Sequence, residues 1–319
     1  MAEVLQEVEV ADVGISPVKS MGFLHGVEAL CFDEEGLFGD REFMLVEAET
    51  GKFISQRQDP ILTQFEIGQR DDGVVFLKYR ALGKESEYYL HTIEETDENT
   101  MDVAVHTWRG KGVDQGDGAA HWASEILGRD VKIVRRSENH PRFVNNNPDI
   151  GKVGFADGYQ LLVASQASVD RVNDWLDEAD EEPVSASQFR AGLLLGQGIE
   201  AFGEDTIGSL KLCVGGLELV LERTKACDRC IIIDTDQDTG ERKMVDGRLA
   251  TPLMKVLKAN GRSGRNVGNG DKRGTFFGQN FRIVMPEDME PGTTINLQTG
   301  ATLQAAITEF PNWVPLDRK

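Results

Sequence analysis

The chain has 319 residues, 40% of them hydrophobic, which is enough for one large or two medium domains with a true core. Its formal net charge is −20, because 54 acidic residues outnumber 34 basic ones. This balance argues against a general nucleic-acid binder and against a protein held on anionic lipid. It leaves open a local basic pocket for a small anion, or an acidic surface that meets a basic partner.

The N-terminus, Met1 to Val10, has neither the basic flank nor the apolar stretch of a secretory signal. No segment approaches the roughly 18 apolar residues of a membrane-spanning helix. Four cysteines in a chain of this length do not make a disulfide framework. We therefore expect no membrane span and a location in the reducing cytoplasm.

The first third of the chain is predicted to form short strands. Turn signals such as Glu35-Gly36, Thr50-Gly51 and Asp72-Gly73 separate runs that are rich in aromatic and β-branched residues. Regular short strands of this kind predict a small antiparallel barrel or sandwich. The runs cover residues 8–13, 28–32, 42–46, 74–79 and 88–91.

A helix is predicted over residues 117–127, where apolar residues recur at spacings of three and four and Asp117 is placed to cap the N-terminus. A strand over 131–134 follows. Residues 138–154 contain two prolines and three consecutive asparagines, which predicts a long connection between two halves.

The second half is predicted to place two further helices among strands. One helix covers 165–178 with Ser165 as its N-cap, and the other covers 249–259. The fold class that results is mainly β with α (α+β). The predicted strands cover residues 193–195, 210–213, 217–221, 230–233, 281–284 and 294–297.

The segment from Arg223 to Cys230 carries the strongest chemical signal. Cys227 and Cys230 form a Cys-x-x-Cys pair, and Arg223, Lys225 and Arg229 surround them in sequence. Nearby cations favour the thiolate, which is the form of cysteine that ligates metals and attacks electrophiles.

Four interpretations of this pair stay open. Half a zinc site lacks a second pair, because Cys31 and Cys213 are lone residues in strand-like runs. A thioredoxin-type redox pair should open a helix, whereas this pair leads into the predicted strand 230–233. A single thiolate suits a soft metal such as molybdenum bound through sulfur. Two small hydrophobic residues in a barrel are the inert alternative.

Several cations are predicted at strand ends, where they could converge on an anion. Lys19-Ser20 follows the first strand, and Arg41 and Arg57 each head a later one. Arg190 adjoins the buried strand 193–195, where a charge must be paired or bind a ligand. Each is also compatible with an ordinary turn, a solvated arginine or an ion pair.

The loop 261–274 combines Gly268-Asn-Gly270 with four basic residues, a composition that can cradle phosphate. It is not a dinucleotide fingerprint, because no strand precedes it and the third glycine is misplaced. A solvated loop is the plain alternative.

Taken in order, these pieces resemble a known family: proteins with an N-terminal MOSC β-barrel domain followed by a MOSC domain. More narrowly, the chain resembles the amidoxime-reducing component group and its bacterial relatives, over roughly residues 8 to 300. The motifs that carry the resemblance are Pro17-Val-Lys-Ser20, Gly39-Asp-Arg41, Gln56-Arg57, Leu162 to Ser168, Phe189-Arg190, Phe202-Gly-Glu-Asp205, Cys227-Asp-Arg-Cys230, Asp238-Thr-Gly240 and Phe277-Gly-Gln279.

The resemblance implies an N-terminal MOSC β-barrel domain over 1–140, including helix 117–127, and a MOSC domain over 141–319. It also implies a molybdenum cofactor, a pyranopterin whose dithiolene holds the metal. Cys230 would then be both the metal ligand and the catalytic residue, with Cys227 nearby but not coordinating. The residues implied to contact the cofactor are Lys19, Ser20, Arg41, Ser165, Ser168, Arg190 and Cys230.

The activity that the resemblance implies is reduction of N-hydroxylated compounds: amidoximes, hydroxylamines and N-hydroxylated bases. Electrons would come from a separate protein, either cytochrome b5-like, a ferredoxin or a flavin reductase. At the level of the family only, pyridoxal phosphate binding is also implied. A non-catalytic cofactor carrier or sulfur-transfer module is the alternative, because the wider MOSC class includes sulfurase domains.

The chain departs from the family pattern at three places. Gly192 stands where an asparagine is usual, and Ile233-Asp234 replaces a pair of threonines. Thr206-Ile207 follows the Glu-Asp step, where an aromatic residue is common. These changes leave the substrate range open.

Overall fold

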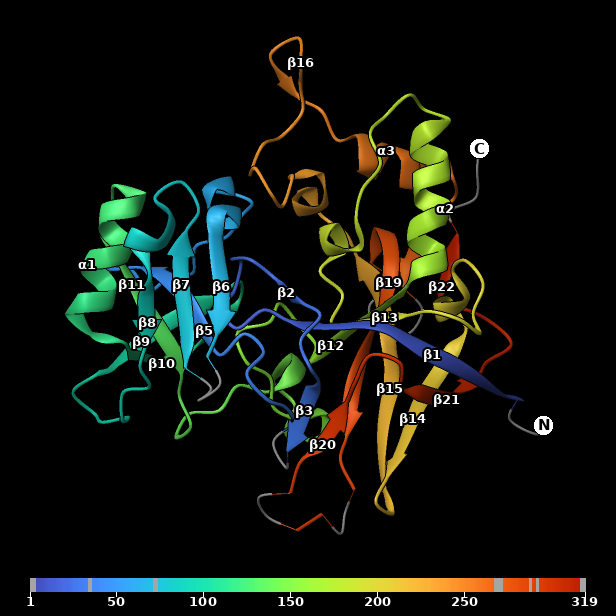
Figure 1. Ribbon diagram of the computed structural model, residues 1–319, viewed down its shortest axis with the longest axis horizontal. Helices are drawn as coiled ribbons and strands as arrows, with labels where there is room; N and C mark the ends of the chain where they lie inside the picture. The colour runs from blue at the N-terminus through green and yellow to red at the C-terminus, as the bar shows by residue number, and fades with distance from the viewer. Residues whose placement is uncertain are drawn as a thin grey trace.

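A closed ring of seven strands forms the barrel on the right of Figure 1. The computed structural model describes residues 4–33, 36–70, 74–266, 272–286, 289–290 and 293–315. Two neighbours, β12 and β13, run parallel, and pairing of β12 with β19 closes the ring. In ring order the strands are β12 (Leu161–Ser165), β13 (Leu193–Leu195), β1 (Val4–Ile15), β21 (Thr302–Ile307), β14 (Ile207–Val214), β15 (Leu217–Asp228) and β19 (Arg273–Val284).

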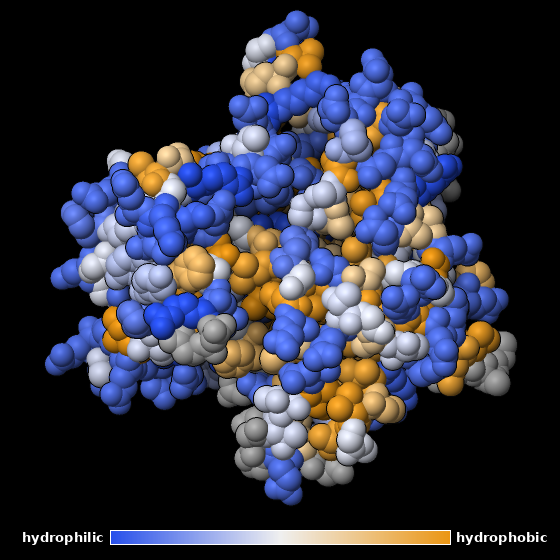
Figure 2. Space-filling model, viewed as in Figure 1, coloured by the Kyte–Doolittle hydropathy of each residue, from blue (hydrophilic) through white to orange (hydrophobic). Residues whose placement is uncertain are grey.

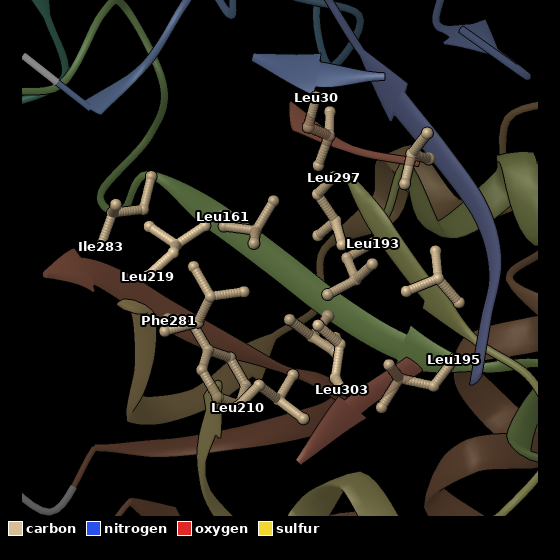
Figure 3. Close-up of a cluster of buried hydrophobic side chains, with 14 of the residues drawn as sticks. Leu30, Leu161, Leu193, Leu195, Leu210, Leu219, Phe281, Ile283, Leu297 and Leu303 are labelled. Atoms are coloured by element: carbon tan, nitrogen blue, oxygen red, sulfur yellow. The ribbon is translucent and has the colours of Figure 1, made fainter. Parts of the chain in front are cut away.

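The barrel encloses a hydrophobic core, because alternate residues of each strand face inward. Figure 3 shows Leu161, Leu193, Leu210 and Phe281 from four different strands pointing toward one another. A three-stranded sheet adds Leu30 and other side chains to the same core. This sheet has the order β20 (Ile295–Leu297), β3 (Leu30–Asp33) and β4 (Gly36–Leu37).

Two smaller antiparallel sheets form the unit on the left of Figure 1. Phe43, Leu45 and Ile133 of one sheet share a core with Phe65 and Leu77 of the other, which is a sandwich arrangement. The helix α1 (Gly116–Leu127) covers this core with Ala119 and Ala123. The sheets are β5 (Phe43–Glu47), β11 (Val131–Arg136), β10 (Trp108–Asp114) and β9 (Thr100–Val105), and β6 (Phe65–Gln69), β7 (Val75–Tyr79) and β8 (Tyr88–Leu90).

Helices α2 (Gln166–Asp177) and α3 (Pro252–Ala259) lie together above the barrel in Figure 1. Val172 of α2 and Leu257 of α3 are fully buried in one cluster with outward-facing barrel residues. Ser165 caps α2 by accepting a hydrogen bond from the Ser168 backbone N–H, at 3.1 Å, as predicted. The predicted fold class, mainly β with α, is confirmed.

Three local predictions were wrong. Helix α1 starts at Gly116 with Gln115 as N-cap, so Asp117 lies in the first turn, and Asp114 accepts the Gly116 N–H instead. Residues 230–233 are not a strand, because the 3-10 helix η7 (Ile231–Asp234) begins there. Arg57 lies in a turn rather than at the head of a strand.

The strand pairing crosses the predicted domain boundary between residues 140 and 141. Strand β1, at the N-terminus, pairs with β13 and with β21, which lies near the other end of the chain. The following residues, from Ser16 to Arg41, therefore run between the barrel and the N-terminal sheets.

The remaining described elements are short. None of the helices in the described ranges is long and apolar enough to cross a membrane. Gly268-Asn-Gly270 lies outside the described residues. The short elements are β2 (Leu24–His25), β16 (Met244–Val245), β17 (Arg248–Leu249), β18 (Ser263–Asn266), β22 (Trp313–Pro315), η1 (Pro60–Gln64), η2 (Gly83–Ser86), η3 (Val144–Asn146), η4 (Pro148–Ile150), η5 (Ala186–Phe189) and η6 (Gly203–Asp205).

Two valines of β1 test whether the N-terminal strand belongs to the barrel. Val10 is fully buried, whereas 63% of Val4 is exposed. We expect Val10→Ala to lower the free energy of unfolding by roughly 2–3 kcal/mol, because two buried methyl groups and their packing are lost. Val4→Ala should change it by less than about 0.5 kcal/mol. Urea unfolding measures both, and equal effects of the two changes would contradict the barrel assignment of β1.

Candidate functional site

A pocket between the barrel and the N-terminal sheets collects most of the predicted site residues, namely Lys19, Ser20, Arg41, Arg190 and Cys230. Its volume is about 180 Å³. A ligand of more than a few heavy atoms must therefore extend from the enclosed part toward the open mouth.

The charge of this pocket is opposite to that of the whole chain. Two carboxylates line it, from Asp157 and Asp228, against five cationic side chains. In a protein of net charge −20, such a concentration of cations favours an anionic ligand at this place. The five cations are Lys19, Arg41, Arg57, Arg190 and Arg229. We call this site the cationic pocket.

Cys230 is placed in the cationic pocket by the end of a long strand. A register shift between Ala226 and Asp228 interrupts the pairing of β15 with β19. Cys230 then becomes the N-cap of η7, and Ile233 anchors this short helix in the core at 1% exposure. Cys227 therefore lies in the last residues of β15, and Cys230 lies between the end of β15 and a single 3-10 turn.

Two arginines face the Cys230 sulfur. Burial opposes the charge of Arg57, but the Cys230 sulfur and the Asp157 carboxylate outweigh burial and raise the pKa of this guanidinium. Burial lowers the pKa of Arg242, and Cys230 counteracts that effect. Arg242 also donates hydrogen bonds to Thr235 Oγ1, at 2.8 Å, and to the Arg57 carbonyl, at 3.2 Å. These bonds tie the residues after Cys230 to the N-terminal sheets.

Cys227 has a cationic neighbour of its own. Arg229 Nη1 lies 3.1 Å from Cys227 Sγ, and Nη2 donates to the Phe189 carbonyl at 2.7 Å. Both sulfurs of the Cys-x-x-Cys pair therefore line the cationic pocket, each close to a guanidinium group.

Asp157 gathers three of the basic groups. Its carboxylate contacts Lys19, lies 3.1 Å from His106 Nε2 and 3.3 Å from Arg57 Nη2. Burial alone would raise the pKa of the Asp157 carboxyl, but Lys19, His106 and Arg57 hold it well below its usual range. The side chain remains 51% exposed, because it borders the open part of the pocket. Asp157 is therefore an anion that solvent or a ligand can reach.

Arg190 is held in the cationic pocket by hydrogen bonds to the segment that follows β1. Its guanidinium donates to the Met21 carbonyl at 2.7 Å and to Ser16 Oγ at 2.8 Å. Burial, with the nearby Arg41, lowers the pKa of Arg190 to about 9. Arg41 in turn pairs with the buried Asp40. Within the described residues, the Ser20 hydroxyl makes no hydrogen bond and is free to meet a ligand.

Strained backbone marks the same residues. Ser20, Arg41 and Arg190 have φ angles of 66°, 50° and 55°, in the left-handed region that L-residues avoid. Each such residue costs roughly 1–2 kcal/mol, and strain of this kind concentrates at functional sites. Their side chains reach the cationic pocket from this unusual backbone, which supports a functional role.

Ser165 and Ser168 are not brought to the cationic pocket. Both are fully buried, and their hydroxyls donate to Glu204 Oε2 at 2.9 and 2.8 Å. The second oxygen of Glu204 is buried without a hydrogen-bond partner. Burial, with the nearby Asp205, raises the pKa of Glu204 to about 7. The two serines thus hold a buried acid one layer behind the pocket.

The sequence departures at Gly192, Ile233 and Asp234 have structural causes. A Cβ atom at Gly192 would lie 2.8 Å from Leu161 Cδ1, so no larger residue fits without movement. Ile233 is a core residue, and Asp234 accepts the Leu253 N–H at 2.8 Å, at the start of α3. Packing therefore explains the residues at positions 192 and 233, and helix capping explains the residue at position 234.

Sequence reasoning missed Asp157, His106 and Arg242 as site residues. Asp157 follows the predicted connection, where no motif marks it, and His106 and Arg242 come from a hairpin turn and a loop. Only the spatial convergence of these segments identifies them.

The described residues contain no group of three or more His, Cys, Asp or Glu side chains that could hold a metal ion. One thiolate and a set of cations cannot enclose a metal alone. They fit a metal that arrives in an anionic cofactor with ligands of its own, because the thiolate adds a soft donor and the cations bind the anion.

Comparison with known proteins gives two matching family models. The MOSC N-terminal beta barrel domain matches residues 7–130, and the MOSC domain matches residues 150–296. Mitochondrial amidoxime-reducing component 1 of Mus musculus is 29% identical over 92% of this chain and 83% of its own length. Mitochondrial amidoxime reducing component 2 of Bos taurus is 30% identical over 74% and 69%. Molybdenum cofactor sulfurase of Bombyx mori is 26% identical over 72% and 28%.

Glu204 predicts how stability depends on pH. Its pKa is raised from 4.5 to about 7 in the folded state, so the folded protein binds this proton more tightly than the unfolded chain. The free energy of unfolding should therefore fall as the pH rises from about 4.5 to about 7, by about 2–3 kcal/mol. Glu204→Gln removes the titration and should abolish this part of the decline.

Urea unfolding at about pH 5 and about pH 8 measures the effect. Glu200→Gln, at an exposed position on the preceding loop, is the matched control and should keep the native pH dependence. If the free energy of unfolding falls by the same amount between these two pH values in the Glu204→Gln variant and in the native protein, the buried acid does not titrate as described.

Proposed function

The chain belongs to the family built from a MOSC N-terminal beta barrel domain and a MOSC domain, and on this premise we propose a molybdenum-cofactor-dependent reductase of N-hydroxylated compounds. The names of its relatives, amidoxime-reducing component and molybdenum cofactor sulfurase, support a function related to the molybdenum cofactor. The proposed substrates are amidoximes, hydroxylamines and N-hydroxylated bases.

The observation that carries the proposal is the position of the Cys230 sulfur in the cationic pocket, facing Arg57 and Arg242. A sulfur ligand suits an inner-sphere bond to a soft metal, and the surrounding cations suit the anionic cofactor that would carry that metal. Cys230 is thus proposed as metal ligand and catalytic residue. The bound cofactor supplies the two-electron chemistry that breaks the N–O bond.

The anionic part of the cofactor is proposed to bind the cations and the free hydroxyl of the same pocket, from Lys19, Ser20, Arg41 and Arg190. Lys19 and Arg57 are paired with Asp157, so a second anion must share them or displace that carboxylate. Ser165 and Ser168 are proposed to act indirectly, by capping α2 and holding Glu204.

Electrons are proposed to come from a separate redox protein, either cytochrome b5-like, a ferredoxin or a flavin reductase. The cytoplasmic location predicted from the sequence stays a prediction, because the relatives are named as mitochondrial. Pyridoxal phosphate binding likewise stays a prediction.

A non-catalytic function in sulfur transfer is the second candidate. The similarity to molybdenum cofactor sulfurase favours it, as does the presence of two cysteines in one pocket. It predicts a persulfide on Cys230 and no reduction of N-hydroxylated substrates with any artificial electron donor.

The Cys-x-x-Cys pair allows a matched test of the metal ligand. We expect Cys230→Ser to abolish reduction of benzamidoxime by the cofactor-loaded protein with an artificial donor, because the metal loses its soft protein ligand. Cys227→Ser should keep most of the activity and about one molybdenum atom per chain. Activity of Cys230→Ser equal to that of the native protein would contradict the proposal. Cofactor binding without any reduction by the native protein would favour sulfur transfer.

Ser20 tests the anion-binding half of the pocket. Removing one hydrogen bond to a charged group costs about 1.5–3 kcal/mol, so Ser20→Ala should weaken cofactor binding about tenfold or more. The free energy of unfolding of the cofactor-free protein should stay unchanged, because this hydroxyl makes no hydrogen bond to any described residue. Cofactor binding is measured after gel filtration by the fluorescence of the oxidised pterin that stays with the protein. Unchanged binding would remove Ser20 from the site.

A further inference from the structure

A second, larger cavity shares a wall with the cationic pocket. Its volume is about 890 Å³, within the roughly 300–1,000 Å³ typical of small-molecule sites. Pro17 and Phe43 line this second cavity, whereas Lys19 lines the cationic pocket. Hydrogen bonds from Phe43 N to Pro17 O, at 2.9 Å, and from Lys19 N to Phe43 O, at 2.8 Å, join the two segments into that wall.

The second cavity has an apolar wall drawn from both halves of the fold. Figure 2 shows apolar surface in the hollow between the N-terminal sheets on the left and the barrel on the right. The side chains come from the end of β1, the loop before β3, and strands β5 and β8, so no single unit could form this wall. They are Ile15, Pro17, Val27, Ala29, Phe43 and Leu90.

Among the described residues, one carboxylate that lines the second cavity has no ion-pair partner. Arg135 lies 2.7 Å from Glu138, and Arg136 lies 2.6 Å from Glu42, so these four neutralise one another. Glu28 also lines the cavity and has no ion-pair partner in the described part of the chain. An anion here would meet Glu28 and the field of a strongly acidic protein. A cation would meet an unpaired carboxylate.

The thiol of Cys31 lines the second cavity and is influenced by the nearby carboxylates. Burial raises the pKa of the Cys31 thiol, and the Glu28 and Asp33 carboxylates raise it further. Glu28 and Cys31 line the same cavity, together with the apolar side chains of Val27 and Ala29.

We propose that the second cavity binds an amphiphilic organic cation, with its ammonium or amidinium head at Glu28 and its apolar body against Ile15, Val27 and Phe43. The apolar wall supplies the hydrophobic contact, and the unpaired carboxylate selects the sign of the head group. This site goes beyond the proposed reductase function and does not depend on it, because no metal or cofactor contributes to the second cavity.

The free cysteines provide a direct readout on the intact protein. Cys31 lines the second cavity, whereas Cys213 is exposed on β14 and does not line it. Phenylbutylamine at about ten times its dissociation constant should slow the alkylation of Cys31 by iodoacetamide about tenfold at alkaline pH. Alkylation of Cys213 should be unchanged, and mass spectrometry resolves the two sites. Phenylbutyrate, of the same shape and opposite charge, should give no protection.

Two variants separate the charge from the apolar wall. Glu28→Gln keeps the shape of an exposed side chain and should weaken protection by the amine about three- to tenfold. Glu49→Gln, at an exposed turn outside the cavity, is the control and should have no effect. Ala29→Trp fills the cavity and should abolish protection.

The proposal is overturned if the amine fails to protect Cys31, or if phenylbutyrate protects it equally well. It is also overturned if the amine protects Cys31 of the Glu28→Gln variant as well as it protects Cys31 of the native protein. None of these results bears on the reductase function, because the assay needs neither molybdenum nor turnover. Should Ala29→Trp fail to fold, the Glu28→Gln result still decides the question.

Discussion

The convergence of Arg57 and Arg242 on Cys230 is the constraint on which the candidate site depends. Arg57 lies in the turn between β5 and η1, and Arg242 follows η7 and donates a hydrogen bond to the Arg57 carbonyl. The two halves of the chain thus meet at one sulfur. A cluster of cations is unfavourable unless an anion balances its charge, and Asp157 supplies part of that balance.

The fold brings these groups together because its N-terminal strand belongs to the C-terminal barrel. Strand β1 pairs with β13 and β21, and the chain then leaves the barrel through Lys19 and Ser20 toward the N-terminal sheets. The crossing segments carry the left-handed residues Ser20 and Arg41. They form one wall with two faces, and each face lines a cavity of different chemistry. One cavity is cationic, and the other is apolar with Glu28, a carboxylate that has no ion-pair partner among the described residues.

Much of this arrangement could be predicted from the sequence. The strand at 193–195 and the N-cap at Ser165 follow local rules of burial and capping. The cations around Cys227 and Cys230 marked this pair as a candidate for chemistry, and the role of Cys230 itself stays a prediction from the family resemblance. The pairing of β1 with β21 could not be predicted, because it joins residues almost 300 positions apart and no local pattern records it. The family resemblance was confirmed by matches to both domain models.

The sequence was less informative where one residue type suits two roles. Ser165 and Ser168 have hydroxyls that could bind a cofactor, but a buried acid occupies them. The apolar run from Ile231 to Ile233 suits a buried strand as well as a 3-10 turn, and only the cap that Asp234 makes on α3 decides between them. Asp157 lacked any local signal, because its importance comes entirely from its partners in space.

The most direct measurement is X-ray absorption at the molybdenum edge of the cofactor-loaded protein, with selenocysteine in place of a single cysteine. If the Cys230 sulfur is an inner-sphere ligand, selenium at position 230 will appear as a direct neighbour of molybdenum, and selenium at position 227 will not. Absence of a molybdenum–selenium contact in the protein substituted at position 230 would contradict the central claim.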